Sequence, residues 1–232
     1  LPAPEQRSLL PIAEHRHRLL SSIRSHPVTF VHGQTGSGKS THLPLFLLQE
    51  HHRQLASSQA KPLRVYVTQP RRVAAVKLAE WLSSLLGSPV GSVVGYSTST
   101  QKCVGEDTQV IYCTAGTLLM MLAHNPAKFR KMSHIVLDEV HERSVHSDLL
   151  CTLVRKMASE AQRRTGAAMS EWQGPKLVVM SATLQTEQWQ RFFSELNHHV
   201  AEANGRESEE SEEISISTRP HPIVKLHLDD LT

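Results

Sequence analysis

The 232-residue sequence has few cysteines and few aromatic residues: three Cys, and 5% Phe, Trp and Tyr together. Cys103, Cys113 and Cys151 are too few and too far apart for a disulfide framework or a zinc site, so we expect core thiols in a reducing compartment. No apolar run approaches the roughly 18 residues that span a bilayer, and no signal-peptide pattern precedes the first helix. These absences predict an intracellular protein, of nucleus or cytoplasm, without a membrane partner. The first residue is Leu rather than Met, which indicates an excised piece.

Positive and negative charges nearly balance each other, and the formal net charge is +3. The segment from Glu202 to Glu213 holds six acids and one base, which leaves 24 bases against 16 acids elsewhere. A mildly basic body is compatible with a polyanionic partner. Fifteen histidines raise the question of a metal site, but the pairs His51-His52 and His198-His199 lie in polar stretches without partner ligands at metal spacing and are expected to be solvated.

Apolar runs alternate with helical patterns along the chain, which is typical of an α/β domain with a mostly parallel sheet. Several of these runs are continuous in Val, Ile and Leu, as in strands that are covered on both faces. The expected strands are Val28–Val31, Leu63–Thr68, Ser92–Tyr96, Gln109–Cys113, His134–Asp138 and Leu177–Ser181. The expected helices are Ala13–Ser25, Lys39–His51, Arg71–Leu86, Ala115–Ala123, Asp148–Ala161 and Glu187–Glu195.

Two polar segments interrupt this alternation, and neither is expected to form secondary structure. Ala161–Gly174 is rich in small and polar residues, and residues 201–213 form an acidic insertion that we expect to be disordered. Strand character resumes at Ile214–Ser217 and Ile223–Leu228.

A glycine-rich loop joins the first strand to the second helix and matches Gly-x4-Gly-Lys-Ser. Glycines permit positive φ and close approach of the backbone, so successive N–H groups can bind phosphates. Lys39 would add a charge near the β and γ phosphates, and the Ser40 hydroxyl would bind Mg²⁺. The alternative is an ordinary Gly/Ser turn, which needs no lysine there. The residues expected to bind the nucleotide phosphates are Gly33, Gln34, Thr35, Gly36, Ser37, Gly38, Lys39, Ser40 and Thr41.

Two acids follow the apolar strand His134–Leu137, at the edge of the sheet where α/β proteins bind ligands. Asp138 is expected to hold Mg²⁺ through a water molecule, and Glu139 to orient and deprotonate the attacking water. Ser40, Asp138 and Glu139 form the expected metal set. His141 either joins this site or is a helix-start histidine without a role. Glu142 and Arg143 either belong to the motif or form an exposed ion pair.

Together, Gly33–Thr41 and the run Asp138-Glu-Val-His-Glu-Arg resemble a superfamily 2 helicase of the DEAH/RNA-helicase-A group. The segment Thr68–Ala75 is similar to motif Ia of that group, Thr114–Leu119 to motif Ib, and Ser181-Ala-Thr to motif III. The resemblance implies a RecA-like three-layer α/β/α domain, a P-loop NTPase that uses ATP or another NTP with Mg²⁺. It also implies that hydrolysis drives translocation on RNA or its unwinding.

The resemblance also implies a division of the chain and a partner domain. Residues 28–200 would form the first RecA-like domain, with residues 1–27 as an N-terminal extension whose helix packs on it. Residues 214–232 would hold a terminal strand and the start of a linker to a second RecA-like domain. That second domain would supply the arginine finger, so this chain alone is expected to bind nucleotide weakly and to turn it over slowly or not at all. Protein partners are not predicted.

Roles for other residues follow from the resemblance alone. Lys39, Asp138, Glu139 and His141 form the catalytic set. Arg71, Arg72 and Thr114 would face the backbone of single-stranded RNA, a contact that reads no base sequence. The alternatives are a solvated helix start for the arginines and a simple N-cap for Thr114. Ser181 and Thr183 would couple the acidic motif to the rest of the machine.

The chain departs from the family pattern at three places. The family usually has Ile-Arg-Phe-Glu where this chain has Ser97–Gln101, and an Arg where it has Met120. Both changes remove positive charge near the expected RNA path. Trp81 stands where the family carries an arginine that lies on the nucleobase, so it either stacks on the base or is a core residue.

Two other functions remain open at this point. An RNA-stimulated NTPase could act as a switch or remodelling factor without processive unwinding. A non-catalytic scaffold with a degenerate nucleotide site is a third possibility, against which the intact set of Lys39, Ser40, Asp138 and Glu139 argues.

Overall fold

The computed structural model describes residues 10–55, 62–164, 172, 174–182, 186–203 and 213–216. An eight-stranded sheet forms its centre, in the order β4-β3-β5-β2-β6-β7-β1-β8. All neighbouring strands are parallel except β3 and β4. The strands are β1 (Val28–Gly33), β2 (Val65–Gln69), β3 (Val94–Ser97), β4 (Lys102–Cys103), β5 (Val110–Thr114), β6 (His134–Leu137), β7 (Lys176–Ser181) and β8 (Glu213–Ile216).

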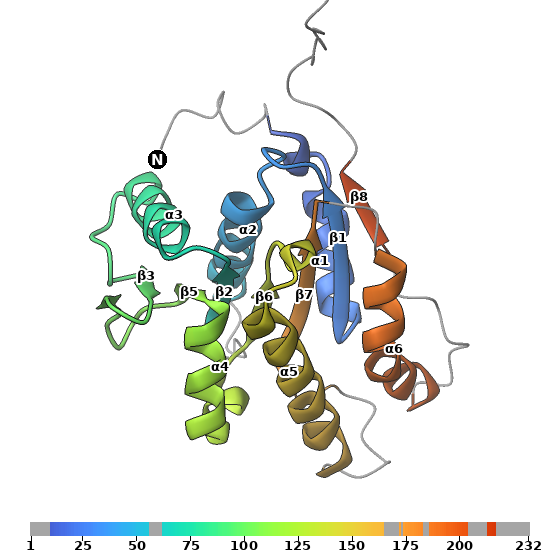
Figure 1. The fold of residues 1–232 in the computed structure, drawn as a ribbon. Coiled ribbons are helices and arrows are strands. Elements are labelled where there is room, and N and C mark those ends of the chain that lie inside the picture. Colours follow the sequence, from blue (N-terminus) through green and yellow to red (C-terminus); the bar gives the residue numbers. More distant parts are fainter. Residues whose placement is uncertain are drawn as a thin grey trace, which may run out of the picture.

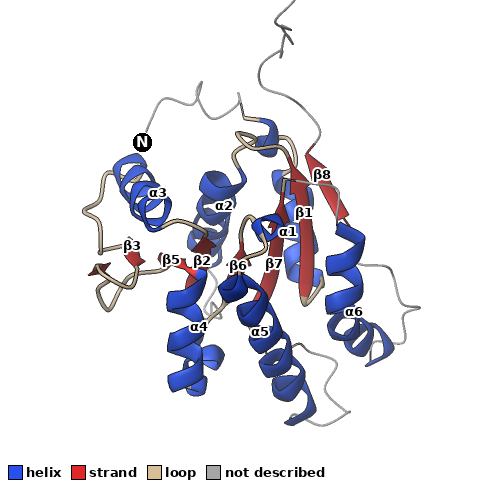
Figure 2. Ribbon diagram, in the orientation of Figure 1, coloured by secondary structure: helices blue, strands red, loops and turns tan. Residues whose placement is uncertain are grey.

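Helices cover both faces of this sheet, which gives three layers (Figures 1 and 2). The α-helices are α1 (Arg16–Ser25), α2 (Lys39–Gln54), α3 (Arg72–Leu85), α4 (Ala115–His124), α5 (Val145–Arg164) and α6 (Thr186–Ala203). The 3₁₀ helices are η2 (Pro11–Ala13), η3 (Pro126–Lys131) and η4 (Val140–Glu142). The predicted mostly parallel α/β/α architecture is confirmed.

Alternate strand residues point to opposite faces, and each face has its own apolar core. In β2, Val65 and Val67 pack with η2, α1, α2 and α3, whereas Tyr66 between them packs with α4, α5 and α6. In β5, Tyr112 and Ile111 divide in the same way. Because both faces are covered, the strands are apolar at nearly every position, as the continuous Val and Ile runs indicated.

All six predicted strands of the main alternation form, with ends within two residues of those expected. The hairpin strand β4 was missed, because two residues carry no readable alternation. A turn holds it: the Thr98 amide donates to the Gln101 carbonyl over 2.8 Å, and β4 pairs antiparallel with β3. The predicted strand Ile214–Ser217 corresponds to β8, and Ile223–Leu228 lies outside the described residues.

The polar segments are partly helical, which corrects the expectation of no secondary structure there. Helix α5 begins at Val145, where the Ser144 hydroxyl accepts from the Ser147 amide over 3.1 Å, and continues to Arg164. Helix α6 continues to Ala203 rather than ending at Glu195. Asn197, beyond the predicted end, bonds both the amide (3.0 Å) and the carbonyl (3.2 Å) of Val28, so a tertiary contact extends the helix. Residues 204–212 lie outside the described part.

The thiols agree with the prediction of core cysteines at two of three positions. Cys113 and Cys151 are buried, and burial raises the pKa of each thiol to about 12, so both are protonated and unreactive at neutral pH. Cys103 is half-buried in β4. In the described residues, no group of three or more His, Cys, Asp or Glu side chains is placed to hold a metal ion, and no helix there is long and apolar enough to cross a bilayer.

Candidate functional site

The loop between β1 and α2 adopts a backbone that its glycines make possible. Gly38 is the N-cap of α2, with φ of 92°, and Gly36 has φ of 87°, so both occupy the left-handed region. At the end of β1, a Cβ on Gly33 would lie 2.9 Å from the Cβ of Ile216 in β8. The loop therefore lies at the carboxyl end of the sheet, with its amides at the start of a sixteen-residue helix.

Lys39 lies inside this loop rather than extending into solvent. Its side chain is buried, and its ammonium donates to the carbonyls of Gly33 and Gln34, the latter over 3.0 Å. Burial lowers the pKa of Lys39, and the nearby carboxylates of Asp138 and Glu139 oppose that shift. The ammonium is thus held at the loop that would cradle phosphates.

The N-terminal residues cover the loop, a contact that the sequence did not predict. The Ile12 amide in η2 donates to the Ser37 carbonyl over 3.2 Å. A Cβ on Gly38 would lie 2.9 Å from the Cγ2 of Ile12, so only glycine allows this packing. Ile12 itself is fully buried. The segment before the first strand is therefore part of the wall of the site.

We predict that Ile12→Ala lowers the free energy of unfolding by about 2–4 kcal/mol, because it leaves a cavity beside the loop. The same variant should bind ATP more weakly, since Ile12 fixes the loop backbone. Ile111→Ala, on the opposite face of the sheet, is the matched control: it should lose similar stability and keep its ATP affinity. Urea unfolding and ATP titration measure the two effects, and equal ATP affinities in both variants would contradict a role for Ile12 in the site.

Asp138 follows β6 and is buried, with 6% of its surface exposed. Its carboxylate accepts from the Gln69 side-chain amide over 2.6 Å and from the Glu139 amide over 2.9 Å. A hydrogen bond from the Ser40 hydroxyl also reaches it, so α2 and β6 meet here. The Asp138 amide donates to the Thr68 hydroxyl over 3.1 Å. Carboxylate and hydroxyl oxygens are hard ligands of the kind that Mg²⁺ prefers, so Ser40 and Asp138 fit such an ion.

Burial, the largest influence, raises the pKa of Asp138 to about 6, and the neighbouring charge of Glu139 acts in the same direction. The hydrogen bonds from Ser40 and Gln69 and the charge of Lys39 oppose this rise. Gln69 was not predicted as a site residue. The available signal was its position as the last residue of β2, which pairs with β6.

Glu139 has one carboxylate oxygen that accepts no hydrogen bond although it is buried. Its Oε2 lies 3.2 Å from Nδ1 of His141, but the Ala182 amide points to the same Nδ1 over 3.4 Å. His141 thus lies between the Glu139 carboxylate and the strand end at Ala182, and it joins the site.

The backbone of this acidic turn is strained at two non-glycine residues. Glu139 has φ of 52° and Arg143 has φ of 46°. A conformation of this kind costs free energy and persists only where the surroundings hold it. Contacts of Arg143 help to stabilise this backbone. Its guanidinium binds the Asp148 carboxylate with two hydrogen bonds of 3.0 Å and lies 5.6 Å from the Trp189 ring. Of the two alternatives for Glu142 and Arg143, the exposed ion pair does not form, because the turn directs Arg143 to α5 and α6 instead.

The structure brings the residues expected to bind RNA to one edge of the sheet. Arg71 is the N-cap of α3 and Arg72 its first residue, and both are exposed. Thr114 is the N-cap of α4, with its hydroxyl accepting from the Thr117 amide over 3.4 Å. Gln69 of β2 and Thr114 of β5 are partners in the sheet, so the two helix starts are adjacent. The N-cap function of Thr114 is confirmed, and RNA contact stays a prediction for all three.

The remaining predicted residues lie around the same edge. Ser181 ends β7 and is buried, Ala182 contacts His141 through its amide, and Thr183 lies outside the described residues. Trp81 has 41% of its surface exposed, so it is not a core residue. Its ring lies 5.7 Å from that of His42, which follows the loop.

The sequence is similar to those of known proteins. Residues 4–192 match the model of the DEAD/DEAH box helicase family. The chain is 32% identical to the ATP-dependent RNA helicase TDRD9 of Homo sapiens over 228 residues, which are 96% of this chain and 14% of that protein. It is 32% identical to the ATP-dependent RNA helicase DHX29 of Mus musculus (98% and 15%), and 37% identical to the probable ATP-dependent RNA helicase DHR2 of Saccharomyces cerevisiae (82% and 24%). The chain thus spans about one seventh of the length of the first two relatives.

Proposed function

We propose that this chain, which belongs to the DEAD/DEAH box helicase family, is the ATP-binding domain of an ATP-dependent RNA helicase. One observation carries the proposal: Lys39, Ser40, Asp138 and Glu139, about 100 residues apart in the chain, meet at the carboxyl edge of the sheet. The Ser40–Asp138 hydrogen bond joins the two motifs directly. A coincidental glycine loop would have no reason to meet a buried carboxylate such as that of Asp138.

The residues divide the work of hydrolysis among them. The loop amides and the Lys39 ammonium would bind the β and γ phosphates, and the start of α2 adds its positive end. Ser40 and Asp138 would hold Mg²⁺, which when bound neutralises charge on the phosphates. Glu139, which follows Asp138 at the same strand end, would orient the attacking water and accept its proton. His141 would link this event to the strand end of β7 through the Ala182 amide.

The full reaction needs groups that we expect from a second RecA-like domain. An arginine finger contributes roughly 10³-fold or more to the rate in related phosphoryl-transfer enzymes. We therefore propose that this chain alone binds ATP weakly and hydrolyses it slowly or not at all. Joined to the second domain, it would alternate between closed and open states and so convert hydrolysis into movement along RNA.

A test of this function is the separation of a duplex RNA that carries a single-stranded tail by the full-length protein, with protein below duplex in concentration. We expect strand release with ATP and none with a non-hydrolysable analogue. A second candidate, an RNA-stimulated switch without unwinding, is favoured by Met120, which is 54% exposed where the family has a cation. RNA-stimulated hydrolysis without strand release would favour that candidate.

We predict that changing Arg71 and Arg72 together to Ala weakens binding of single-stranded RNA about tenfold at low salt. Each lost phosphate contact should also reduce the salt slope by about 1, because fewer counterions are released. ATP affinity should stay nearly unchanged, since neither guanidinium reaches the phosphate loop. Fluorescence anisotropy at several salt concentrations measures this, with the exposed Arg191→Ala on α6 as control. An unaltered salt slope would make these arginines structural.

We predict that Trp81→Ala lowers ATP affinity about threefold to tenfold, the range expected for loss of one stacked ring. Ribose triphosphate, which has no base, should bind the variant and the unmodified protein equally. Trp81→Arg, which restores the family residue, should recover most of the ATP affinity. If the variant lost affinity equally for ATP and for ribose triphosphate, Trp81 would support α2 rather than stack on the base.

A further inference from the structure

A hollow of about 400 Å³ lies on the face of the sheet beside α4, toward the edge strand β4. It exists because α4 lies over β5 and β2, while β3 and β4 extend beyond it. Strand residues Tyr66 and Ile111, which point to this face, form its floor, and η3 forms the opposite wall. Four cationic side chains line it, and we call it the basic pocket. They are Arg64, Lys102, Lys128 and Lys131.

The charge of the basic pocket has a single sign. No acidic side chain lines it, and in the described part of the chain none of its three lysines forms an ion pair. All three lysines are exposed. Lys128 and Lys131 are three residues apart in a 3₁₀ helix, so their side chains are on the same side. The Arg64 side chain is held by a hydrogen bond with Tyr66. An anionic ligand would find four donors around one opening.

The floor of the basic pocket is mainly apolar. Ile111 and Met132 are buried beneath it, and Met121 of α4 and Val104 after β4 flank it. Tyr66 has only 9% of its surface exposed, so it presents no open ring face. A nucleobase binds such sites mainly by stacking on an exposed aromatic plane, which Tyr66 does not provide. An aliphatic side chain, in contrast, would bury apolar area on this floor.

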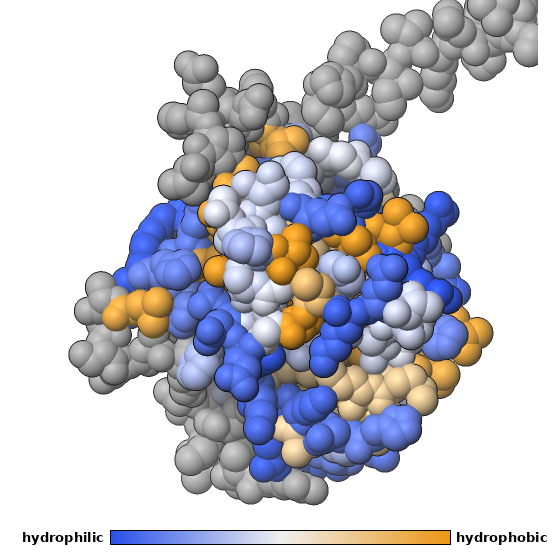
Figure 3. Space-filling view, turned by 90° about the vertical axis from the view of Figure 1, so that its left-hand side faces the viewer, coloured by the Kyte–Doolittle hydropathy of each residue, from blue (hydrophilic) through white to orange (hydrophobic). Residues whose placement is uncertain are grey.

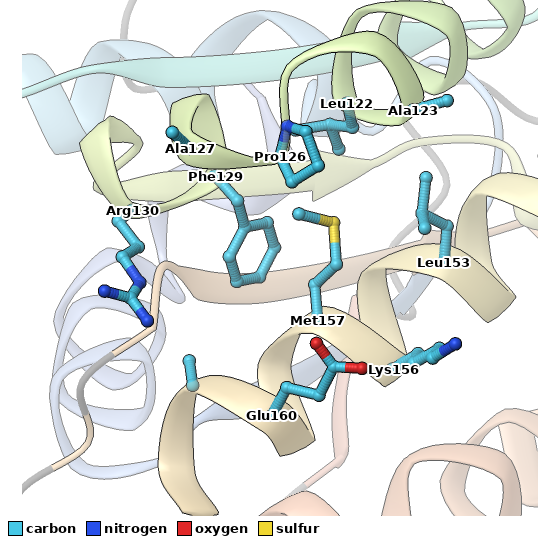
Figure 4. A pocket seen from close by; sticks show the side chains of 11 residues that line it. Leu122, Ala123, Pro126, Ala127, Phe129, Arg130, Leu153, Lys156, Met157 and Glu160 are labelled. Carbon is cyan, nitrogen blue, oxygen red and sulfur yellow. The ribbon is translucent and has the colours of Figure 1, made fainter. Parts of the chain in front are cut away.

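A second hollow, of about 420 Å³, lies on the other flank of η3. Unlike the basic pocket, it is lined by charged side chains of both signs. Figure 4 shows its lining, in which Arg130, Lys156 and Glu160 surround Phe129 and Met157. Its charges are mixed, so it does not select an anion. Figure 3, which faces the edge of the sheet near β3 and β4, shows separate hydrophobic areas surrounded by hydrophilic ones rather than one broad apolar face.

We propose that the basic pocket binds an acidic peptide segment of a partner protein. Carboxylates of the segment would pair with Lys102, Lys128, Lys131 and Arg64, and one aliphatic side chain between them would lie on the floor. The binding requires no hydrolysis and does not depend on the proposed helicase function. It would connect a partner to the domain away from the expected contacts of RNA at Arg71 and Arg72.

The test uses the 232-residue chain and a fluorescein-labelled peptide, Glu-Glu-Glu-Leu-Leu-Glu-Glu-Glu, in anisotropy titrations. Control peptides replace the glutamates by glutamines or the leucines by serines. Lys128→Glu combined with Lys131→Glu reverses both charges on the η3 wall of the pocket, and Met121→Gln makes its apolar wall more polar. Lys156→Glu, at an exposed lysine of α5 in the mixed hollow, is the charge control, with half the charge change of the double variant. Far-UV circular dichroism and thermal unfolding check that each variant folds.

We expect the acidic peptide to bind, more weakly as salt rises, and both control peptides to bind at least about threefold less well. The double Lys→Glu variant should lose about tenfold or more in affinity, Met121→Gln about threefold, and Lys156→Glu almost nothing. If Lys156→Glu lost about half as much binding free energy as the double variant, the proposal would be overturned, since binding would then follow net charge. Absence of peptide binding at millimolar concentration would also overturn the proposal. Loss of oligo-uridine binding in the double lysine variant without loss of peptide binding would overturn it as well, because it would assign the site to RNA.

Discussion

Glutamine in place of Glu139 will reduce ATP turnover by the full-length protein about 10³-fold while ATP still binds. A glutamine amide cannot accept the proton of the attacking water, but it fills the same space and keeps the neighbouring charge of Asp138 in place. Single-turnover hydrolysis measures the chemical step, and nucleotide affinity is measured by titration on the same sample.

The control for this variant is Glu106→Gln, the same chemical change at an exposed glutamate in the loop after β4. It should leave both turnover and ATP affinity within about twofold. If Glu139→Gln keeps normal turnover, the water is activated by another group, and the assignment of Glu139 as general base is wrong. If it loses ATP affinity as strongly as turnover, Glu139 contributes to binding rather than to proton transfer.

Alanine in place of Lys39 will remove most of the ATP affinity, by about tenfold to a hundredfold. Charge-assisted hydrogen bonds to phosphate are among the strongest in proteins, and the buried position of Lys39 keeps solvent from replacing it. The ammonium also bonds to the Gly33 and Gln34 carbonyls, so the loop loses a support. Isothermal titration with ATP and with ADP shows which phosphates depend on it, and we expect the larger loss with ATP.

Lys156→Ala is the control, since Lys156 is exposed on α5, outside the site. Urea unfolding of both variants separates a local loss of affinity from a general loss of stability. A Lys39→Ala protein that unfolds in the same urea range and binds ATP normally would show that the loop does not hold phosphates. Arginine at this position restores the charge but not the compact shape, so it should rescue binding only in part.

The sequence predicted the parts of the site that depend on local rules. A strand, a glycine loop and a helix in that order determine where Lys39 and Ser40 lie, because the glycines at 36 and 38 allow positive φ. The apolar run before Asp138 predicts a buried strand whose end lies at the sheet edge. Such local patterns need no knowledge of the rest of the chain, and the resulting elements were correct to within a few residues.

What the sequence could not predict are contacts between segments far apart in the chain. The Gln69 amide meets Asp138 only because β2 and β6 are neighbours in the sheet, and Ile12 meets Gly38 only because η2 folds over the loop. The end of α6 was misplaced for the same reason, since Asn197 is held by the backbone of Val28. Polar residues such as Gln69 and Asn197 give no periodic signal, so their partners appear only in the folded structure.

The strained turn after Asp138 also had no signature in the sequence. Glu139 and Arg143 adopt positive φ although neither is glycine, and the pairing of Arg143 with Asp148 and its position beside Trp189 help to hold that shape. Local preference would favour another backbone at both positions. The strain lies beside the proposed general base, where a fixed carboxylate direction matters most for orienting water.

If this domain belongs to an RNA helicase, ATP hydrolysis at its site should respond to RNA. ATP turnover by the full-length protein is followed alone, with single-stranded RNA, and with single-stranded DNA of the same sequence. We expect slow turnover without nucleic acid and severalfold faster turnover with RNA, lost in the Glu139→Gln variant. Turnover that RNA does not change, or that persists in Glu139→Gln, would show that this site is not the RNA-dependent ATPase proposed.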